Sequence, residues 1–242
     1  MTGRVALHGG GEFLPGDERF LDALLRTATT QGRAAPLRIV IVPTAAARGR
    51  PDLAASNGVQ ALRRRAAALG IEVEASIARI VDAATAAEPD LIDSIARADL
   101  VYLPGGDPDL IPTLFRDTAA GRALRHAHAS GGVIAGASAG AMGLAEWTWT
   151  PAGGIRGLGL VPGIAVFPHY DESVRARWQA KLAGIAPADL GYLGLDERTG
   201  VIGGGNDWVV AGEGAARWFP AGASDPIVVV DGGRLELLSG AG

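Results

Sequence analysis

The chain has 242 residues, 48% hydrophobic and 20% charged, which is typical of one soluble globular domain and excludes disorder over most of its length. Its net charge of −4 provides no basic field that could hold nucleic acid or an anionic membrane surface. The absence of cysteine excludes disulfides, thiolate nucleophiles and cysteine-based zinc sites.

Five short apolar segments rich in β-branched residues do not alternate with polar residues, as in parallel strands that are buried on both faces. They comprise residues 5–7, 37–42, 100–103, 133–135 and 164–167. Between them, segments rich in Ala, Leu and Arg have a helical period, at 17–29, 53–69, 91–98 and 109–128. This alternation predicts an α/β sandwich.

The C-terminal third of the chain differs in pattern. A further helix is predicted over 172–183, followed by short strands separated by glycines, at 200–202, 208–211, 227–230 and 234–238. We expect these strands to add antiparallel edges to the sheet. With no linker and no internal repeat, residues 1–242 are predicted to form a single domain.

A serine follows one of the buried strands, within GGVIAGASAGAM at residues 131–142. The pattern Gly136-x-Ser138-x-Gly140 is typical of a nucleophile elbow, where a serine lies on a sharp turn between strand and helix. The strained backbone there needs neighbours without side chains, which the two glycines provide. The alternative is a tightly packed turn whose serine only caps the helix.

A second glycine-rich turn, VYLPGGDPD at residues 101–109, also follows a strand. In an elbow enzyme the amide after the nucleophile, here Ala139, receives the oxyanion together with an amide from a neighbouring loop. Gly105 or Gly106 would supply the second amide, because either can bring bare backbone close to a ligand. The alternative is an ordinary turn, and no third ligand supports a metal site at Asp107 and Asp109.

A serine hydroxyl needs a general base, and the chain has four histidines. His126 and His128 lie two positions apart on a predicted helix, and we expect both to face solvent. His8 ends the first strand and is a reserve candidate, since α/β sites form at the carboxyl edge of the sheet. His169, which also follows a strand, is the best placed.

The histidine in turn needs a carboxylate that fixes its tautomer. Asp171 and Glu172 lie beside His169 in sequence and are poor choices, because sequence neighbours usually point apart. Glu197, on a turn between apolar segments, is preferred over Glu146, which lies just beyond the elbow helix. Glu197 could instead be a turn carboxylate paired with the neighbouring Arg198.

Together these residues resemble the serine peptidases of the dipeptidase E and cyanophycinase family, and the resemblance covers nearly the whole chain. It rests on HGGGEF at 8–13, IVPTAA at 41–46, YLPGGD at 102–107, GASAGAM at 136–142, GLGLVPG at 157–163, FPHYDE at 167–172 and GLDERTG at 194–200. The family's fold is similar to that of class I glutamine amidotransferases. The resemblance therefore implies a three-layer α/β sandwich around a mostly parallel, flavodoxin-like sheet.

By position, the resemblance implies that Ser138 is the nucleophile, His169 the base and Glu197 the orienting acid, with Gly106 and Ala139 as oxyanion donors. Glu146 stays open, because the family's acid is placed either before or after the histidine. The implied reaction is hydrolysis of a peptide or isopeptide bond next to an aspartyl residue, without a metal or other cofactor.

The substrate would be a small peptide or another aspartyl-containing molecule, with Gly105 and Asp107 as candidate binding residues. Its carboxylate calls for a cation, and five arginines lie in segments that could reach it: Arg48, Arg50, Arg175, Arg177 and Arg198. Two departures restrict this expectation. The residues around His169 differ from those of cyanophycinases, and Ala141 stands where dipeptidases tend to carry Asn.

Two other functions remain open: an esterase or acyltransferase on the same fold, and a catalytically inactive relative that binds a ligand. Rossmann and P-loop nucleotide binding are disfavoured, because the required glycine spacings are absent. Residues 1–13 lack an apolar core of signal-peptide length, so we expect a cytoplasmic protein without nucleic-acid or membrane partners. A homodimer remains an open alternative to a monomer.

Overall fold

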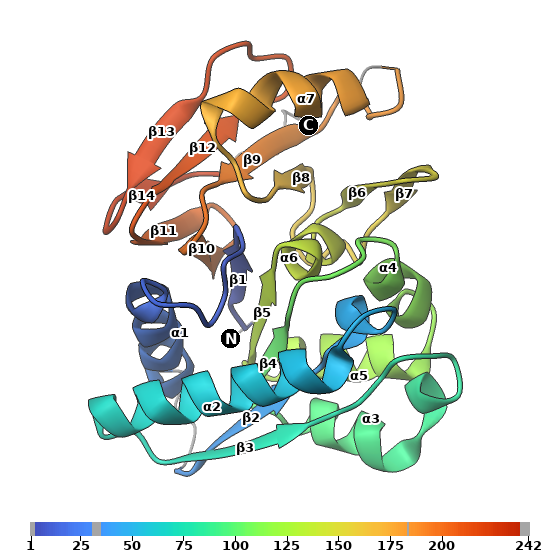
Figure 1. Cartoon of the computed structure of the whole chain (residues 1–242), viewed down its shortest axis with the longest axis vertical. Helices are drawn as coiled ribbons and strands as arrows, with labels where there is room; N and C mark the ends of the chain where they lie inside the picture. The colour runs from blue at the N-terminus through green and yellow to red at the C-terminus, as the bar shows by residue number, and fades with distance from the viewer. Residues whose placement is uncertain (1–2, 31–34, 183, 238–242) are drawn as a thin grey trace.

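The computed structural model describes residues 3–30, 35–182 and 184–237 (Figure 1). Its main sheet has eight strands in the order β14-β11-β10-β1-β5-β4-β2-β3. Five neighbouring strands are parallel: β1 (Val5–His8), β5 (Val133–Ala137), β4 (Leu100–Leu103), β2 (Leu37–Ile41) and β3 (Val73–Ile77). Four of these five are the buried apolar segments expected from the sequence. The exception is β3, which lies at the sheet edge with mostly exposed or half-buried side chains.

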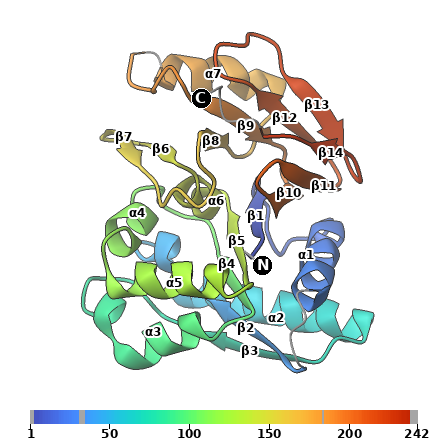
Figure 2. The ribbon, with the colours of Figure 1, turned by 180° about the vertical axis from the view of Figure 1, so that it is seen from behind.

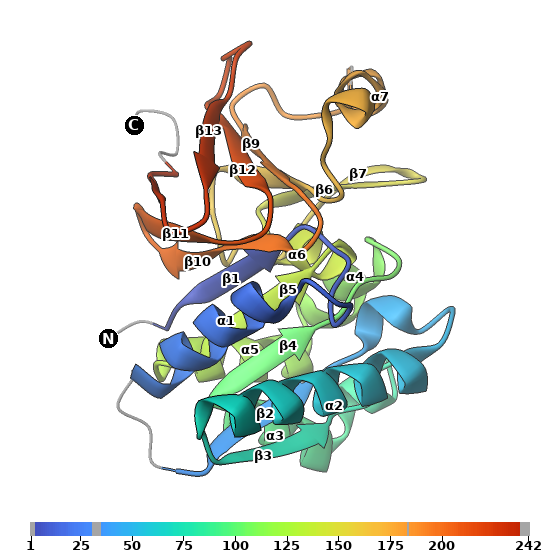
Figure 3. The same ribbon diagram turned by 60° about the vertical axis from the view of Figure 1, so that its left-hand side comes forward.

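Helices cover both faces of this sheet (Figure 2, Figure 3). One apolar cluster joins the sheet to α1 (Glu18–Thr30) and α2 (Pro51–Leu69). A second cluster, on the other face, includes α3 (Pro89–Ala96), α4 (Leu110–Phe115), α5 (Ala119–Ala129) and α6 (Ala139–Leu144). This arrangement confirms the three-layer sandwich. None of the helices in the described ranges is long and apolar enough to cross a lipid bilayer.

Three of the four strands expected at an antiparallel edge are present there. The expectation for 227–230 was wrong, because this segment pairs with residues 215–218 in a separate sheet. β10 (Thr199–Gly204) pairs with β1, and β11 (Asp207–Gly212) and β14 (Arg234–Leu235) continue the sheet outward. Residue 238, the last of the predicted strand 234–238, lies outside the described residues, as does residue 183 at the end of the predicted helix 172–183.

A second sheet, which the sequence patterns did not reveal, lies beside β10 and β11, on the side of the main sheet away from β2 and β3 (Figure 1). It contains β13 (Ile227–Val230), β12 (Ala215–Phe219), β9 (Gly191–Leu195) and β8 (Ile164–Phe167), with α7 (Glu172–Leu182) after β8. Segment 164–167 is therefore a buried parallel strand as expected, but it pairs with β9 outside the main sheet. A hairpin of β6 (Trp147–Thr150) and β7 (Gly153–Arg156) packs Trp147 against this layer.

The helix predicted over 109–128 is divided into α4 and α5. The cause is Thr118, whose backbone is extended and whose hydroxyl accepts a hydrogen bond from the Gly121 amide, so that a new helix starts there. Two short 3₁₀ helices, Thr44–Ala46 and Thr85–Ala87, complete the described elements.

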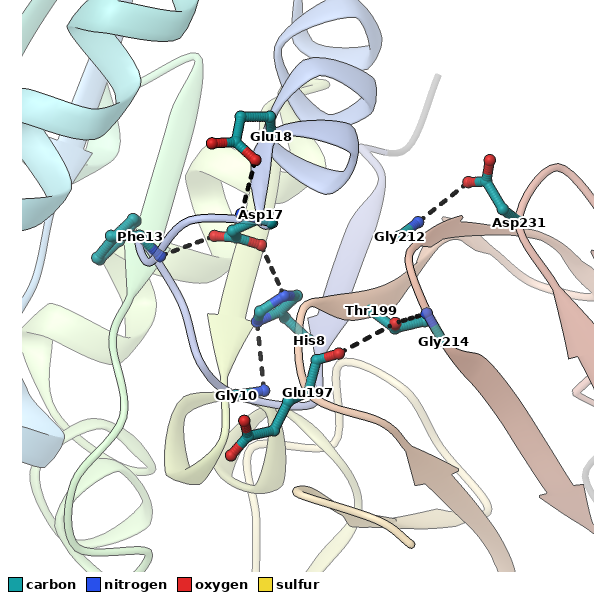
Figure 4. A network of polar contacts seen from close by, with 11 residues as sticks. His8, Gly10, Phe13, Asp17, Glu18, Glu197, Thr199, Gly212, Gly214 and Asp231 are labelled. Carbon is teal, nitrogen blue, oxygen red and sulfur yellow. Dashed lines mark hydrogen bonds and ion pairs between the residues drawn. The ribbon is translucent and has the colours of Figure 1, made fainter.

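A buried polar pair fixes the turn that follows β1 (Figure 4). Asp17 Oδ1 lies 3.0 Å from His8 Nε2, and both side chains are buried, with exposed fractions of 1% and 0%. The other Asp17 oxygen accepts the Phe13 amide, and His8 Nδ1 accepts the Gly10 amide. These contacts connect the end of β1, its turn and the start of α1.

We expect Asp17→Ala to lower the free energy of unfolding by about 3 to 5 kcal/mol, because it removes one partner of a buried polar pair. Urea denaturation measures the loss. The control is Asp52→Ala, which breaks an exposed pair with Arg79 and should cost less than about 1 kcal/mol. Equal losses in the two variants would contradict a structural role for the buried pair.

Candidate active site

Ser138 occupies a strained turn between β5 and α6. Its φ of +49° is rare for a residue with a side chain. No residue with a side chain fits at either neighbouring glycine. A Cβ at Gly136 would lie 2.5 Å from the Gly140 carbonyl carbon. A Cβ at Gly140 would lie 2.1 Å from the Leu103 oxygen. The pattern read from the sequence is thus a real elbow, in which both glycines are sterically required.

The elbow serine contacts a histidine. Ser138 Oγ lies 2.9 Å from His169 Nε2, and His169 Nδ1 lies 2.9 Å from Glu197 Oε1. Because a carboxylate only accepts hydrogen bonds, the ring proton belongs on Nδ1, which leaves Nε2 free to accept the serine proton. The structure therefore brings together the three side chains selected from the sequence.

The turn after β1 holds His169 in place. The His169 amide donates to the Gly9 oxygen at 2.7 Å, and a Cβ at Gly10 would lie 2.2 Å from His169 Cε1. The imidazole thus packs directly against bare backbone. Half of the His169 side chain remains exposed, at 47%, so the ring is open to a ligand.

Glu197 lies on the turn between β9 and β10. The amide of Arg198, the next residue, donates to the Gly10 oxygen at 2.7 Å, so the same β1 turn also fixes this segment. The Glu197 carbonyl accepts the Thr199 hydroxyl, which itself accepts the Gly214 amide (Figure 4). The alternative acid, Glu146, instead accepts the Gly163 amide at 2.6 Å. Of the two carboxylates, the structure pairs only Glu197 with His169.

The glycine turn after β4 packs against the serine, since a Cβ at Gly105 would lie 3.1 Å from Ser138 Cβ. Within the described part of the chain, the amides of Ala139 and Gly106 have no acceptor, whereas the Gly105 amide donates to Glu12 Oε1 at 2.8 Å. Gly106 has a φ of +151°, and a Cβ there would lie 2.0 Å from the Ala45 oxygen. The geometry leaves Gly106, and not Gly105, as the loop amide able to receive an oxyanion; its role stays a prediction.

Asp107, the other candidate for substrate binding, lies in an ion-pair group at the rim of this turn. Arg48 lies 3.7 Å from Asp107 and 2.7 Å from Asp109, and it lowers the pKa of Asp109. The Asp107 amide donates to Ala45, which fixes the turn. Binding of substrate by Asp107 stays a prediction.

The other histidines lie elsewhere. His8 is buried against Asp17, His126 is exposed, and the carbonyl of His128 accepts the Gly3 amide near the start of β1. The expectation that His128 faces solvent was wrong: it is half-buried, and desolvation lowers its pKa. Among the described residues, no group of three potential ligands could hold a metal ion.

Glu12 is the site residue that sequence reasoning missed. It lay in the HGGGEF block, at the carboxyl edge of the sheet, without an assigned role. Its position after a strand and a run of glycines was a usable signal, but its contact with Gly105 joins residues 93 positions apart.

Comparisons with known proteins agree with this fold. The model of peptidase family S51 matches residues 5–208. A crystal structure of a peptidase from an acI-B1 Actinobacterium is 25% identical, with a TM-score of 0.81 over 98% of this chain and 97% of the other. A protein from Listeria monocytogenes EGD-e, described as a candidate peptidase E, matches at 15% identity and a TM-score of 0.58, over 88% of this chain and all of the other. No curated protein matches the sequence.

The Listeria likeness supports the fold alone, whereas the family model spans the elbow, the histidine and the acidic turn. Both comparisons agree with the resemblance drawn from the sequence motifs. The chain belongs to peptidase family S51, the dipeptidase E family, and is a serine peptidase.

Proposed function

We propose that the protein hydrolyses a peptide or isopeptide bond next to an aspartyl residue through an acyl-enzyme on Ser138. The observation that carries the proposal is the continuous series of contacts from Ser138 Oγ through the His169 ring to Glu197, at 2.9 Å in each step. Both are hydrogen-bond distances, and a serine nucleophile must lie within hydrogen-bond reach of its base.

In the first half of the proposed reaction, Ser138 Oγ bonds to the carbonyl carbon while His169 Nε2 takes the hydroxyl proton. The displaced electron pair moves to the carbonyl oxygen, where the Ala139 and Gly106 amides would stabilise it. Glu197 stabilises the imidazolium. Collapse breaks the C–N bond, and His169 gives its proton to the leaving amine.

The second half uses water in place of the serine. Water bonds to the acyl carbon as His169 takes one of its protons, and the ester C–O bond then breaks. His169 returns that proton to Ser138 Oγ, so that a carboxylic acid leaves and the starting side chains are restored.

Aspartyl specificity is supported by a cavity that contains both Glu12 and Arg50. Its volume is 420 Å³, and Arg50 is the only cationic residue in its lining. Arg50 makes no ion pair within the described part of the chain, whereas Arg48 is occupied by Asp107 and Asp109. Arg50 is therefore the arginine we assign to the substrate carboxylate.

We expect Glu197→Gln to lower kcat by at least about 100-fold, because a carboxamide cannot stabilise the imidazolium and can select the wrong tautomer. Steady-state kinetics on aspartyl dipeptides measure the loss. Glu146→Gln, the matched control, should stay within about threefold of the wild type. A larger loss in the Glu146 variant would reassign the acid.

We expect Arg50→Met to lower kcat/KM for aspartyl peptides by about 10- to 100-fold, the loss typical of one charge-assisted hydrogen bond. The matched alanyl peptides should change little. Arg64→Met, an exposed substitution further along α2, is the control. An equal loss on both peptides would remove Arg50 from substrate selection, and cleavage of esters but of no peptide would favour the esterase alternative.

A further inference from the structure

We propose that the buried pair of His8 and Asp17 positions the catalytic base, His169. The pair acts through the peptide group that joins Gly9 to Gly10, which lies between the pair and the base. The inference rests on the proposed function of His169 and adds two positioning residues that the hydrolytic steps do not use.

The backbone of the base is strained. His169 has a φ of +49°, in the left-handed region that residues with side chains rarely adopt. Such a conformation persists only where the surrounding structure holds it. Here the His169 amide donates to the Gly9 oxygen at 2.7 Å, and the following amide, of Tyr170, donates to the Leu195 oxygen at 2.9 Å. The direction of the Gly9 carbonyl therefore helps to set the position of the imidazole.

A single peptide group connects this carbonyl to the buried pair. The Gly9 carbonyl and the Gly10 amide belong to the same trans peptide, which is planar. Its N–H donates to His8 Nδ1 at 3.3 Å, and its oxygen accepts the His169 amide. Because the N–H and C=O of a trans peptide point in opposite directions within one plane, a contact that fixes the N–H also fixes the C=O.

The contact with Gly10 requires one tautomer of His8. Nδ1 accepts the Gly10 amide only while it carries no proton, so the proton of the neutral ring lies on Nε2. Nε2 is 3.0 Å from Asp17 Oδ1, and a carboxylate oxygen can only accept (Figure 4). Asp17 therefore selects the tautomer that orients the peptide. This tautomer is the opposite of the one that His169 needs.

The alternative is that the pair only stabilises the fold, and two substitutions of His8 separate these roles. His8→Asn places an oxygen near the Nδ1 position, so it can accept the Gly10 amide but cannot reach Asp17. His8→Gln places an amide nitrogen near the Nε2 position, so it can donate to Asp17 but lacks the acceptor for Gly10. Both remove the ring that packs on Phe20, with centroids 4.4 Å apart, so this loss is matched.

The test measures the rate at which a fluorophosphonate labels Ser138, a reaction that needs the base but no particular peptide. We expect His8→Gln to slow labelling by about 10- to 100-fold, because a displaced base loses its alignment with the nucleophile. His8→Asn should react at least about fivefold faster than His8→Gln. Stability against urea should rank the two variants the other way, since only His8→Gln keeps a donor for the buried carboxylate.

The control is Glu18→Gln. Glu18 accepts the amide of Gly16 at 2.8 Å, in the same turn but outside the peptide that carries the proposal. We expect this variant to be labelled at the rate of the wild type.

The histidine tautomers provide a readout that needs no variant to fold. In wild-type protein with nitrogen-labelled histidine, NMR should find the ring proton of His8 on Nε2 and that of His169 on Nδ1. A His8 proton on Nδ1, or labelling that is equally slow in both His8 variants, would overturn the role of the pair alone. A wild type that the reagent does not label would overturn the proposed function as well.

Discussion

The site depends on the carboxyl end of a single strand, β1, which lies between the strand of the nucleophile and the strand that follows the acid. His8 is in register with Ala137, just before Ser138, and with Gly200, shortly after Glu197. One residue further, the Gly9 carbonyl accepts the His169 amide, and the Gly10 carbonyl accepts the Arg198 amide. The turn after β1 therefore sets the distances among three side chains from distant segments.

The central place of this turn explains why it consists of glycines and why the buried pair of His8 and Asp17 lies next to it. The lack of a side chain at Gly10 lets the His169 ring pack closely against the turn. His8 and Asp17, which are both buried, stabilise the same turn from the protein interior. The strain at Ser138 is compensated by the same packing, since β5 is fixed against β1 on one side and β4 on the other. Rigid packing of β1, β4 and β5 thus keeps the Ser138 hydroxyl in place while it stays accessible to a ligand.

The charges around the nucleophile have different partners. Arg48 is neutralised by two aspartates at the rim, and Glu197 is directed to His169. Glu12 and Arg50 line one cavity without protein counterions among the described residues. A substrate carboxylate near the scissile carbonyl would pair with Arg50, as the proposed aspartyl preference requires.

Much of the main sheet could be predicted from the sequence, because buried parallel strands are continuous apolar runs between helical segments. The elbow was also predictable, since only glycines fit on either side of Ser138. The β3 strand was not, because VEASI is short and largely exposed. The second sheet and the position of Glu12 depend on long-range contacts, such as β9 with β12 and Glu12 with Gly105, that no local pattern encodes.

The central claim is that Ser138 is an activated nucleophile, and intact-mass analysis after treatment with a fluorophosphonate tests it most directly. The account predicts one covalent adduct per chain, mapped by peptide sequencing to Ser138, absent in Ser138→Ala and formed far more slowly in His169→Ala. An unmodified wild-type protein, or an adduct on another residue, would contradict the account.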